Sequence, residues 1–301
     1  MTCSVILVNY NTLEITRNCI NSIFLHTKEV NFELIVVDNN SSDGSVEEFS
    51  KDERINLVVS KENIGFGRAN NLGSKIASGE FLFFLNSDTL LKENSILKML
   101  SFFENHEKKL NIGVLGCLLV DRNNSINGYG NSFPTSRSET EKQWSQVPLI
   151  RNFVTLPKIN NLFDDEIFFK VDYVIGADML MRRSLFEKMN GFYQGFFMYY
   201  EETDLQKRIT DYGLKQYIFK DTRIIHLEEA SGNAIQNYSN KKRMITHKSR
   251  VLYLKRCDSK RFYKFAAIDF LFLVLNFFNF KYTFKENFLY FREVVKAYLK
   301  K

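Results

Sequence analysis

Residues 79–89 read GEFLFFLNSDT, and this stretch decides the fold. The five apolar residues at 81–85 indicate a strand buried on both faces, as in a parallel sheet. The run ends in the polar triplet Asn86-Ser87-Asp88. Ligands of open α/β sheets bind just beyond the carboxyl ends of the strands, and these oxygen-bearing side chains suit a hard divalent cation and, through it, a diphosphate. On these residues alone an alternative is equally strong: Asp88 starts a helix from Thr89 onward, since Asp is a favoured N-cap.

Strands and helices alternate on both sides of this stretch. Short apolar runs predict further strands at 4–8, 32–37, 55–59 and 112–120, and apolar residues at helical spacing predict helices from about Leu13 and around 96–103. Such alternation is typical of an α/β fold with a mostly parallel sheet and right-handed crossovers. We therefore expect a nucleotide-binding half at residues 1–120.

The pattern changes at Asp121. Residues 121–170 hold all three prolines and mixed polarity, which predicts a long excursion with little regular structure. Order returns near 171, with a short helix capped by Ser184 and a second helix over 201–212. Strands follow at 215–219 and 222–225, and the latter ends in His226. We expect residues 121–235 to form the acceptor-binding and catalytic half of one domain spanning 1–235.

Residues 236–301 differ in charge from the rest of the chain. Ten basic residues lie between 241 and 264 against the single acid Asp258, which indicates an anionic partner. The apolar run at 265–280 is broken by Asp269 and two Asn, so it is too short and too polar to span a bilayer. It predicts a helical C-terminal region, either lying in the plane of an anionic membrane surface or packed on protein.

The composition is that of an ordinary globular protein, with 45% hydrophobic and 25% charged residues. The four cysteines form no CxxC pair, so a reduced, cytoplasmic protein is expected, peripheral on the cytoplasmic face of the inner membrane if its tail binds lipid. The first residues lack the features of a signal peptide. No nucleic-acid-reading module is recognisable, and we expect no nucleic-acid partner.

The motifs that carry most information follow one another along the chain: VNYN (8–11), VDNNSSDG (37–44), NIGF (63–66) with NN (70–71), LNSDT (85–89), GA (176–177) with ML (179–180), GF (191–192), FFMY (196–199) with EETDL (201–205), and His226. In this order they resemble family-2 inverting glycosyltransferases of the GT-A fold, and most of all the rhamnosyltransferase-like subgroup that builds bacterial surface polysaccharides.

The resemblance implies a role for each matching residue. Asp38 would hydrogen-bond the nucleotide base, Asp88 would ligate a Mg²⁺ or Mn²⁺ ion that bridges the diphosphate, and His226 would be a further ligand of metal or phosphate. A carboxylate in the first turn of the 201 helix would be the catalytic base. The nucleotide pocket would be lined by Asn9, Tyr10, Asn11, Asn63, Gly65, Asn70 and Asn86.

One position departs from the family pattern. The usual Glu-Asp pair at the start of this helix is Glu201-Glu202 here. Glu202 occupies the place of the base and is our first choice, with Glu201 and Asp204 as alternatives. Without the family context, Glu202 would be expected only as an acid at a helix N-terminus, favoured by the helix dipole. In the same way, Asp38 would only cap the turn that follows it.

The implied reaction moves a sugar, with rhamnose as the family-level choice, from a UDP- or dTDP-sugar to a saccharide or lipid-linked acceptor. Two other functions compete with it. A non-catalytic nucleotide-sugar-binding protein would tolerate Glu202 in place of Asp. A nucleotidyltransferase would need a Gly-rich loop with Arg or Lys after the first strand, and residues 9–12 read NYNT instead.

Overall fold

The computed structural model describes residues 2–145, 166–227 and 238–300 of the chain. Among the described residues the chain forms two compact units, which we describe separately. The first contains residues 2–132, 166–197 and 201–227. The second contains residues 133–145, 198–200 and 238–300.

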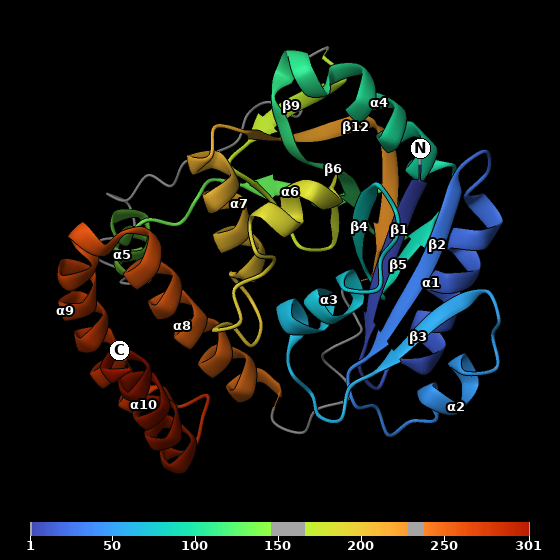
Figure 1. Cartoon of the computed structure of the whole chain (residues 1–301). Helices are drawn as coiled ribbons and strands as arrows, with labels where there is room; N and C mark the ends of the chain where they lie inside the picture. The colour runs from blue at the N-terminus through green and yellow to red at the C-terminus, as the bar shows by residue number, and fades with distance from the viewer. Residues whose placement is uncertain (1, 146–165, 228–237, 301) are drawn as a thin grey trace. The chain divides into compact units, whose positions relative to one another are not determined.

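The first unit is built on one large sheet (Figure 1). Its strands are β1 (Thr2–Asn9), β2 (Asn31–Asp38), β3 (Ile55–Val59), β4 (Phe81–Asn86), β5 (Thr89–Leu91), β6 (Ile112–Val120), β7 (Ile126–Gly128), β9 (Phe168–Val171), β11 (Asp178–Arg182) and β12 (Lys215–His226). Its helices are α1 (Leu13–His26), α2 (Ser45–Phe49), α3 (Phe66–Ser74), α4 (Ser95–Leu110), α6 (Arg183–Lys188) and α7 (Glu201–Asp211). The strands β8 (Gly130–Asn131) and β10 (Tyr173–Val174) form a separate antiparallel pair.

The order of the main sheet is β3-β2-β1-β4-β11-β6-β12-β5. Strands β1 to β4 are mutually parallel, and so are β6 and β12. In contrast, β11 runs antiparallel to both of its neighbours. This mixed α/β sheet confirms the predicted mostly parallel core, and it aligns the ends of β1, β2, β3 and β4 at one edge. Ligand-binding loops of such sheets lie at this edge.

Helices cover both faces of the sheet. Val5 and Leu7 of β1 belong to a core cluster with Cys19 of α1 and Leu100 of α4. On the other face α3 packs very closely, because a Cβ atom at Gly73 would lie only 2.8 Å from Ile6. The alternation of side chains along each strand therefore places α1 and α4 on one face and α3 on the other.

Four local predictions differ from the structure. The short helix expected to be capped by Ser184 begins at Arg183, with Arg182 at its N-cap position, so Ser184 lies within its first turn. Thr89 begins the short strand β5 rather than a helix, because its segment pairs with β12; the next helix begins at Ser95 and has Asn94 at its N-cap position. Asp88 is therefore not a helix cap. Residues 215–226 form one strand with a register shift, not two strands. The excursion after Asp121 contains β7, β8 and a helix, and its residues 146–165 lie outside the described part of the chain.

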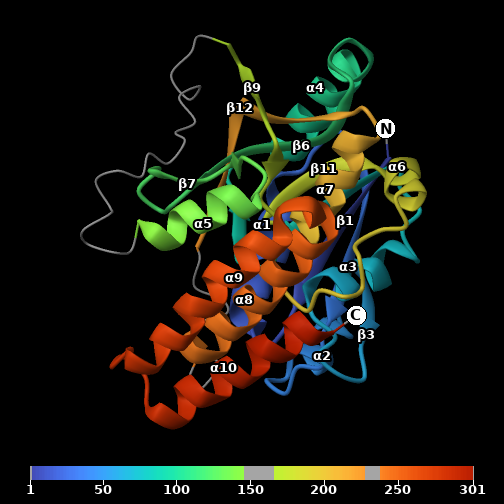
Figure 2. The same cartoon turned by 90° about the vertical axis from the view of Figure 1, so that its left-hand side faces the viewer.

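The second unit is helical among its described residues (Figure 2). It contains α5 (Ser136–Trp144), α8 (Tyr238–Cys257), α9 (Ser259–Leu275), the 3₁₀ helix η3 (Asn276–Phe278) and α10 (Phe284–Leu299). Both α5 and α10 begin with a capping box, formed by Thr135 with Ser138 and by Thr283 with Glu286. The predicted C-terminal helical region is present. No described helix is long and apolar enough to cross a membrane.

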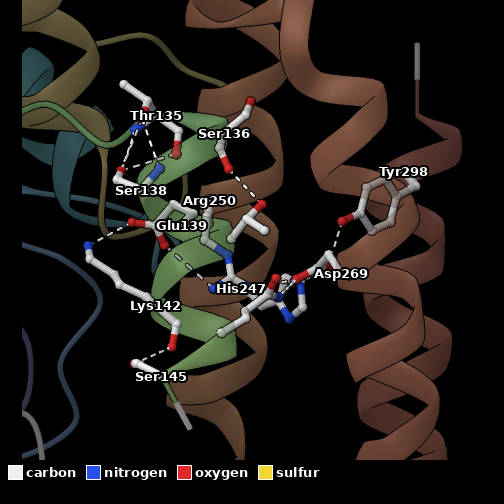
Figure 3. A network of polar contacts seen from close by, with 12 residues as sticks. Thr135, Ser136, Ser138, Glu139, Lys142, Ser145, His247, Arg250, Asp269 and Tyr298 are labelled. Atoms are coloured by element: carbon white, nitrogen blue, oxygen red, sulfur yellow. Dashed lines mark hydrogen bonds and ion pairs between the residues drawn. The ribbon is translucent and has the colours of Figure 1, made fainter. Parts of the chain in front are cut away.

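A buried polar cluster joins all four helices of this unit (Figure 3). Its centre is Asp269 of α9, whose side chain is fully buried. Asp269 accepts hydrogen bonds from His247 Nε2 (2.6 Å), Arg250 Nη2 (2.9 Å) and the Tyr298 hydroxyl (2.5 Å). The amide of Gln143 in α5 donates to the same carboxylate. We call these residues the Asp269 cluster.

In the Asp269 cluster the negative charge of Asp269 lies against the positive charge of Arg250. Burial opposes ionisation of Asp269, but the hydrogen bond from His247, the charge of Arg250 and the hydrogen bond from Tyr298 hold the pKa of Asp269 below its usual value. Burial, with the charge of Arg250, lowers the pKa of His247. A neutral His247 ring with its proton on Nε2 donates to Asp269 and accepts the hydroxyl of Tyr290 at Nδ1. The cluster therefore contains an ion pair between Asp269 and Arg250 with a neutral histidine beside it.

Candidate active site

The loops after β1 and β2 are joined by side chains of the predicted nucleotide site. Asn9 is fully buried, and its Nδ2 donates to Asp38 Oδ2 (2.7 Å) and to Ser41 Oγ (3.0 Å). Its Oδ1 accepts the hydroxyls of Thr12 and Thr16, both at 2.8 Å. Asn9 therefore uses its whole amide within the protein and sets the position of Asp38.

Asp38 is also fully buried, and its second oxygen accepts the backbone N–H of Ser41 at 2.8 Å. The turn-capping role considered for this residue is thus present. Its contact with a nucleotide base remains a prediction.

A second connection between these loops was not visible in the sequence. Asn11, in a left-handed conformation (φ 54°), accepts the N–H of Ser42 at 2.7 Å. Asp43 Oδ2 accepts the N–H of Leu13 at 2.9 Å and so caps α1 from a loop 30 residues away. Burial opposes its ionisation, but hydrogen bonds from the Ser45 hydroxyl and from the N–H groups of Leu13 and Ser45 leave the pKa of Asp43 below its usual value. Tyr10 is half-buried at the turn between the two connections.

The loop after β3 joins the same edge of the sheet. Asn63 Oδ1 accepts from Asn39 Nδ2 (3.0 Å) and from the N–H of Gly65 (3.1 Å), and Asn39 in turn accepts the N–H of Ile64. Asn70, in α3, is buried and donates to the carbonyl of Phe66 one turn earlier in the chain. The predicted nucleotide-site residues of β1, β2 and β3 therefore lie in one hydrogen-bonded rim.

Gly65 is the position where this rim meets the second half of the unit. Its backbone lies at φ 86° and ψ 168°, a region that only glycine adopts readily. A Cβ atom there would lie 2.0 Å from the carbonyl oxygen of Phe197, which also accepts the N–H of Phe66. The glycine thus allows the 192–197 segment to close against the rim.

We expect Gly65→Ala to lower the free energy of unfolding by about 3 kcal/mol or more, because backbone strain adds to a backbone clash. Gly44→Ala is the matched control, since Gly44 also has a positive φ (87°) but open space around its Cβ position. Its cost should be about 1 kcal/mol, the strain alone. Denaturant unfolding of both variants measures the difference, and equal losses would contradict the close contact at Phe197.

Asp88 and His226 are 138 residues apart in the sequence but lie close together in the structure. Strand β5 pairs with β12 so that Thr89 lies opposite His226, and the N–H of Leu227 donates to the Asp88 carbonyl. Asp88 Oδ1 lies 3.4 Å from His226 Nε2, and Asn86 Nδ2 lies 3.5 Å from the same nitrogen. The structure therefore brings three predicted site residues together at the end of β4.

This pair fits a divalent cation of the Mg²⁺ or Mn²⁺ type. A carboxylate oxygen and an imidazole nitrogen are side by side and nearly buried. Within the described ranges, no group of three or more His, Cys, Asp and Glu side chains is placed to hold a metal ion. The pair would thus supply two ligands, and substrate phosphates and water the others, as is usual for Mg²⁺ at diphosphate sites.

Glu202 packs against the backbone segment that hydrogen-bonds to Asn86. It lies in the first turn of α7, and a Cβ atom at Gly176 would lie 3.5 Å from its Cγ. The next carbonyl, that of Ala177, accepts the N–H of Asn86 at 2.9 Å. The successive residues Gly176 and Ala177 therefore lie next to Glu202, the predicted base, and next to Asn86, respectively.

The three acids of the α7 first turn have different surroundings. Glu201 is buried beneath α3, where a Cβ atom at Gly67 would lie 3.2 Å from it. Asp204 is buried and accepts Arg208 Nε at 2.9 Å, while the same guanidinium donates to the carbonyls of Met189 and Gly191. Of the three, Glu202 is the one with a partly exposed side chain. Burial raises the pKa of Glu202, which makes its carboxylate a stronger base.

Asp178 is a buried acid that the sequence analysis left without a role. It begins β11 opposite Leu85, one residue before Asn86, and its Oδ2 accepts the N–H of Cys117 at 2.6 Å. Its Oδ1 has no hydrogen-bond partner among the described residues. Burial raises the pKa of Asp178 to about 7, although the Cys117 N–H and the charge of His226 oppose the shift. The signal in the sequence was an acid within the apolar run ADMLM.

Comparison with known proteins identifies the family of the chain. The glycosyl transferase family 2 model matches residues 4–189. The chain is 29% identical to the rhamnosyltransferase WbbL of Escherichia coli over 170 residues, 54% of this chain and 60% of that protein. It is 25% identical to the O-antigen biosynthesis protein RfbC of Myxococcus xanthus, over 73% of this chain and 17% of that protein. The chain thus spans less than two thirds of either relative.

Solved structures show the same fold. Staphylococcus aureus TarS 1–349, in complex with UDP-GlcNAc, aligns with a TM-score of 0.57 at 18% identity, covering 99% of this chain and 79% of that one. The mannosyltransferase PcManGT of Pyrobaculum calidifontis, in complex with GDP-Man and Mn²⁺, aligns with a TM-score of 0.55 at 16% identity, covering 98% and 73%. The fold is therefore that of GT-A glycosyltransferases, and the family match covers more than half of the sequence: the chain belongs to glycosyl transferase family 2.

Proposed function

We propose that this protein is an inverting glycosyltransferase of bacterial surface polysaccharide synthesis. It would transfer a sugar from a nucleoside-diphosphate sugar to a saccharide or lipid-linked acceptor. The observation that carries the proposal is the contact of Asp88 with His226 beside Asn86, with Glu202 packed beside Gly176, whose neighbour Ala177 accepts the N–H of Asn86. Rhamnose with a dTDP donor is our first choice of substrate, supported by the similarity to WbbL.

The donor would lie along the rim formed by the loops after β1, β2 and β3. The side-chain hydrogen bonds of that rim keep its backbone in place before the nucleotide arrives, which lowers the entropic cost of binding. Asp88 and His226 would hold a Mg²⁺ or Mn²⁺ ion against the diphosphate. That ion, when bound, supplies positive charge against the charge that develops on the leaving nucleoside diphosphate.

Glu202 would act as the general base. It takes the proton of the acceptor hydroxyl as that oxygen forms a bond to the anomeric carbon from the side opposite the leaving group. The bond from the anomeric carbon to the diphosphate oxygen breaks in the same step, so the configuration inverts. Asp178, behind Asn86 and near His226, would position the cation-binding pair rather than contact the substrate.

The names of the relatives support a place in surface polysaccharide synthesis, because they include an O-antigen biosynthesis protein and, at 30% identity over 54% of this chain, the minor teichoic acid biosynthesis protein GgaB of Bacillus subtilis. A cytoplasmic site of action is supported by the four free cysteines, three of which are buried in the core.

A panel of UDP-, dTDP- and GDP-sugars, assayed with Mn²⁺, Mg²⁺ or EDTA, tests the proposal. We expect turnover of one donor class that EDTA abolishes and either metal restores. Asp88→Asn should lower turnover about 10²-fold or more, since it removes one of two protein ligands to the charge-neutralising ion. Asp211→Asn, in an exposed ion pair with Lys207, is the control and should behave as wild type.

Two results would contradict the proposal. One is wild-type turnover that neither EDTA nor Asp88→Asn changes, which would remove the metal role. The other is tight donor binding without turnover of any donor and acceptor, which would favour a nucleotide-sugar-binding protein instead.

A further inference from the structure

Helix α9 has an apolar surface on the side that faces away from its own unit. Its buried side contacts α5, α8 and α10 through residues such as Phe265 and Leu273. Its other side is exposed among the described residues and carries several large apolar side chains. Further exposed apolar residues follow along the chain in η3, in the turn after it and at the start of α10, and we call the whole set the α9–α10 apolar face. Its members are Tyr263, Phe270, Leu271, Val274, Leu275, Phe278, Phe280, Phe284 and Phe288.

The exposure of this face is large. Phe278, Phe280 and Phe284 expose 70%, 96% and 72% of their surface. Single exposed apolar side chains are ordinary, but a contiguous group of aromatic and aliphatic side chains marks an interaction surface. A helix that is apolar all round is normally covered on all sides.

The Asp269 cluster explains why α9 does not turn this face inward. Asp269 lies on the opposite side of the helix from the apolar face, and it is held there by groups from α5, α8 and α10 (Figure 3). Rotation of α9 to bury Phe270 and Val274 would take the Asp269 carboxylate away from Arg250 and His247. A buried charge left without partners costs several kcal/mol. The cluster thus fixes the rotation of α9 about its axis.

The charge around the face indicates what covers it. Residues 238–301 hold sixteen Lys and Arg against four Asp and Glu, a net charge of +12, while residues 1–237 hold 25 against 31, a net charge of −6. Exposed cations lie along the same segment as the apolar face: Lys260, Arg261 and Lys264 on α9, Lys281 in the turn before α10, and Lys285 on α10. A second copy of the unit would bring the same positive charge against it, whereas an anionic lipid surface complements both the cations and the apolar side chains.

We propose that the α9–α10 apolar face docks in the plane of an anionic membrane surface. The Phe and Leu side chains enter the boundary between headgroups and acyl chains, and the Lys and Arg side chains contact lipid phosphates. The helices then lie on the bilayer, consistent with the absence of a spanning helix among the described residues. This inference concerns a surface outside the catalytic residues and does not rest on sugar transfer.

Flotation of the full chain with vesicles tests it. We expect the protein to float with phosphatidylcholine vesicles that contain phosphatidylglycerol, to float weakly with phosphatidylcholine alone, and to dissociate as salt is raised. Lys264→Glu/Lys281→Glu/Lys285→Glu should weaken binding on the order of a hundredfold. Phe278→Ser/Phe280→Ser/Phe284→Ser should weaken it on both kinds of vesicle.

The matched control is Leu25→Ser/Val59→Ser/Ile76→Ser, which removes three exposed apolar side chains of the first unit and should bind vesicles as wild type. Circular dichroism of each variant verifies the fold.

The proposal is overturned if the wild type does not float with anionic vesicles, or if the Phe variant floats as well as the control. It is also overturned if the wild type is a dimer that binds no vesicles and the triple Phe variant is a monomer. Donor turnover in solution, without vesicles, is scored separately and reports on the proposed catalysis alone.

Discussion

Glu202→Gln should fold and bind donor as the wild type does, but lose about 10²–10⁴-fold in kcat, the range that general-base catalysis contributes. The amide keeps the size of the side chain and removes its ability to take a proton. Burial raises the pKa of Glu202, so the wild-type carboxylate is a better base than an exposed one. Steady-state kinetics with donor and acceptor, together with donor titration, measure the two effects.

The neighbouring acids provide the controls for this experiment. Asp204→Asn should lower thermal stability rather than kcat at low temperature, because Asp204 is buried against Arg208. Glu202→Asp restores the Glu-Asp pair typical of the family and should retain much of the activity. Near-wild-type turnover in Glu202→Gln would exclude this residue as the base. Loss of turnover at full stability in Glu201→Gln or Asp204→Asn would assign the role to that position.

Asp269→Asn should destabilise the helical unit by about 3–5 kcal/mol, the usual cost of removing one partner of a buried ion pair. The substitution leaves Arg250 charged and mostly buried, and it removes the anion that His247 and Tyr298 contact. Denaturant unfolding followed by far-ultraviolet circular dichroism measures the loss.

A surface acid of the same unit gives the comparison. Glu293 contacts Lys248, Arg292 and Lys296 at a partly exposed site, so Glu293→Gln should cost less than about 1 kcal/mol. Equal effects of the two substitutions would show that the Asp269 cluster does not hold the four helices together. Such a result would also weaken the argument that this cluster determines which side of α9 faces outward.

Much of the catalytic unit was predictable from local patterns. The apolar runs at 4–8, 32–37, 55–59, 81–85 and 112–120 all became strands of the sheet. The runs at 81–85 and 112–120 are buried on both faces, which needs continuous apolar residues. The polar residues that follow each run then had to lie at the same edge, because parallel strands end together. The order of the matching motifs was enough to identify the family.

Predictions from local sequence patterns were wrong where hydrogen bonds between distant segments determined the structure. Thr89–Leu91 became a strand because β12, more than 120 residues later, supplies its hydrogen bonds. Asp43 caps α1 from another loop, and Asp178 enters the site only because β11 inserts antiparallel between β4 and β6. Helical periodicity does not show which of the three acids in one helical turn remains partly exposed.

By itself the sequence determined the α/β class, the positions of the strand ends and the set of acids, amides and histidine from which a diphosphate site can be made. These follow from the periodicity of buried residues and from motifs read within a few positions of one another. Only the tertiary structure decided that Asp88 meets His226, that Glu202 packs beside Gly176, next to the residue that pairs with Asn86, and that Asp269 turns the apolar face of α9 outward. The reason is physical: hydrogen-bond pairing and charge burial act between residues that are close in space, whatever their separation along the chain.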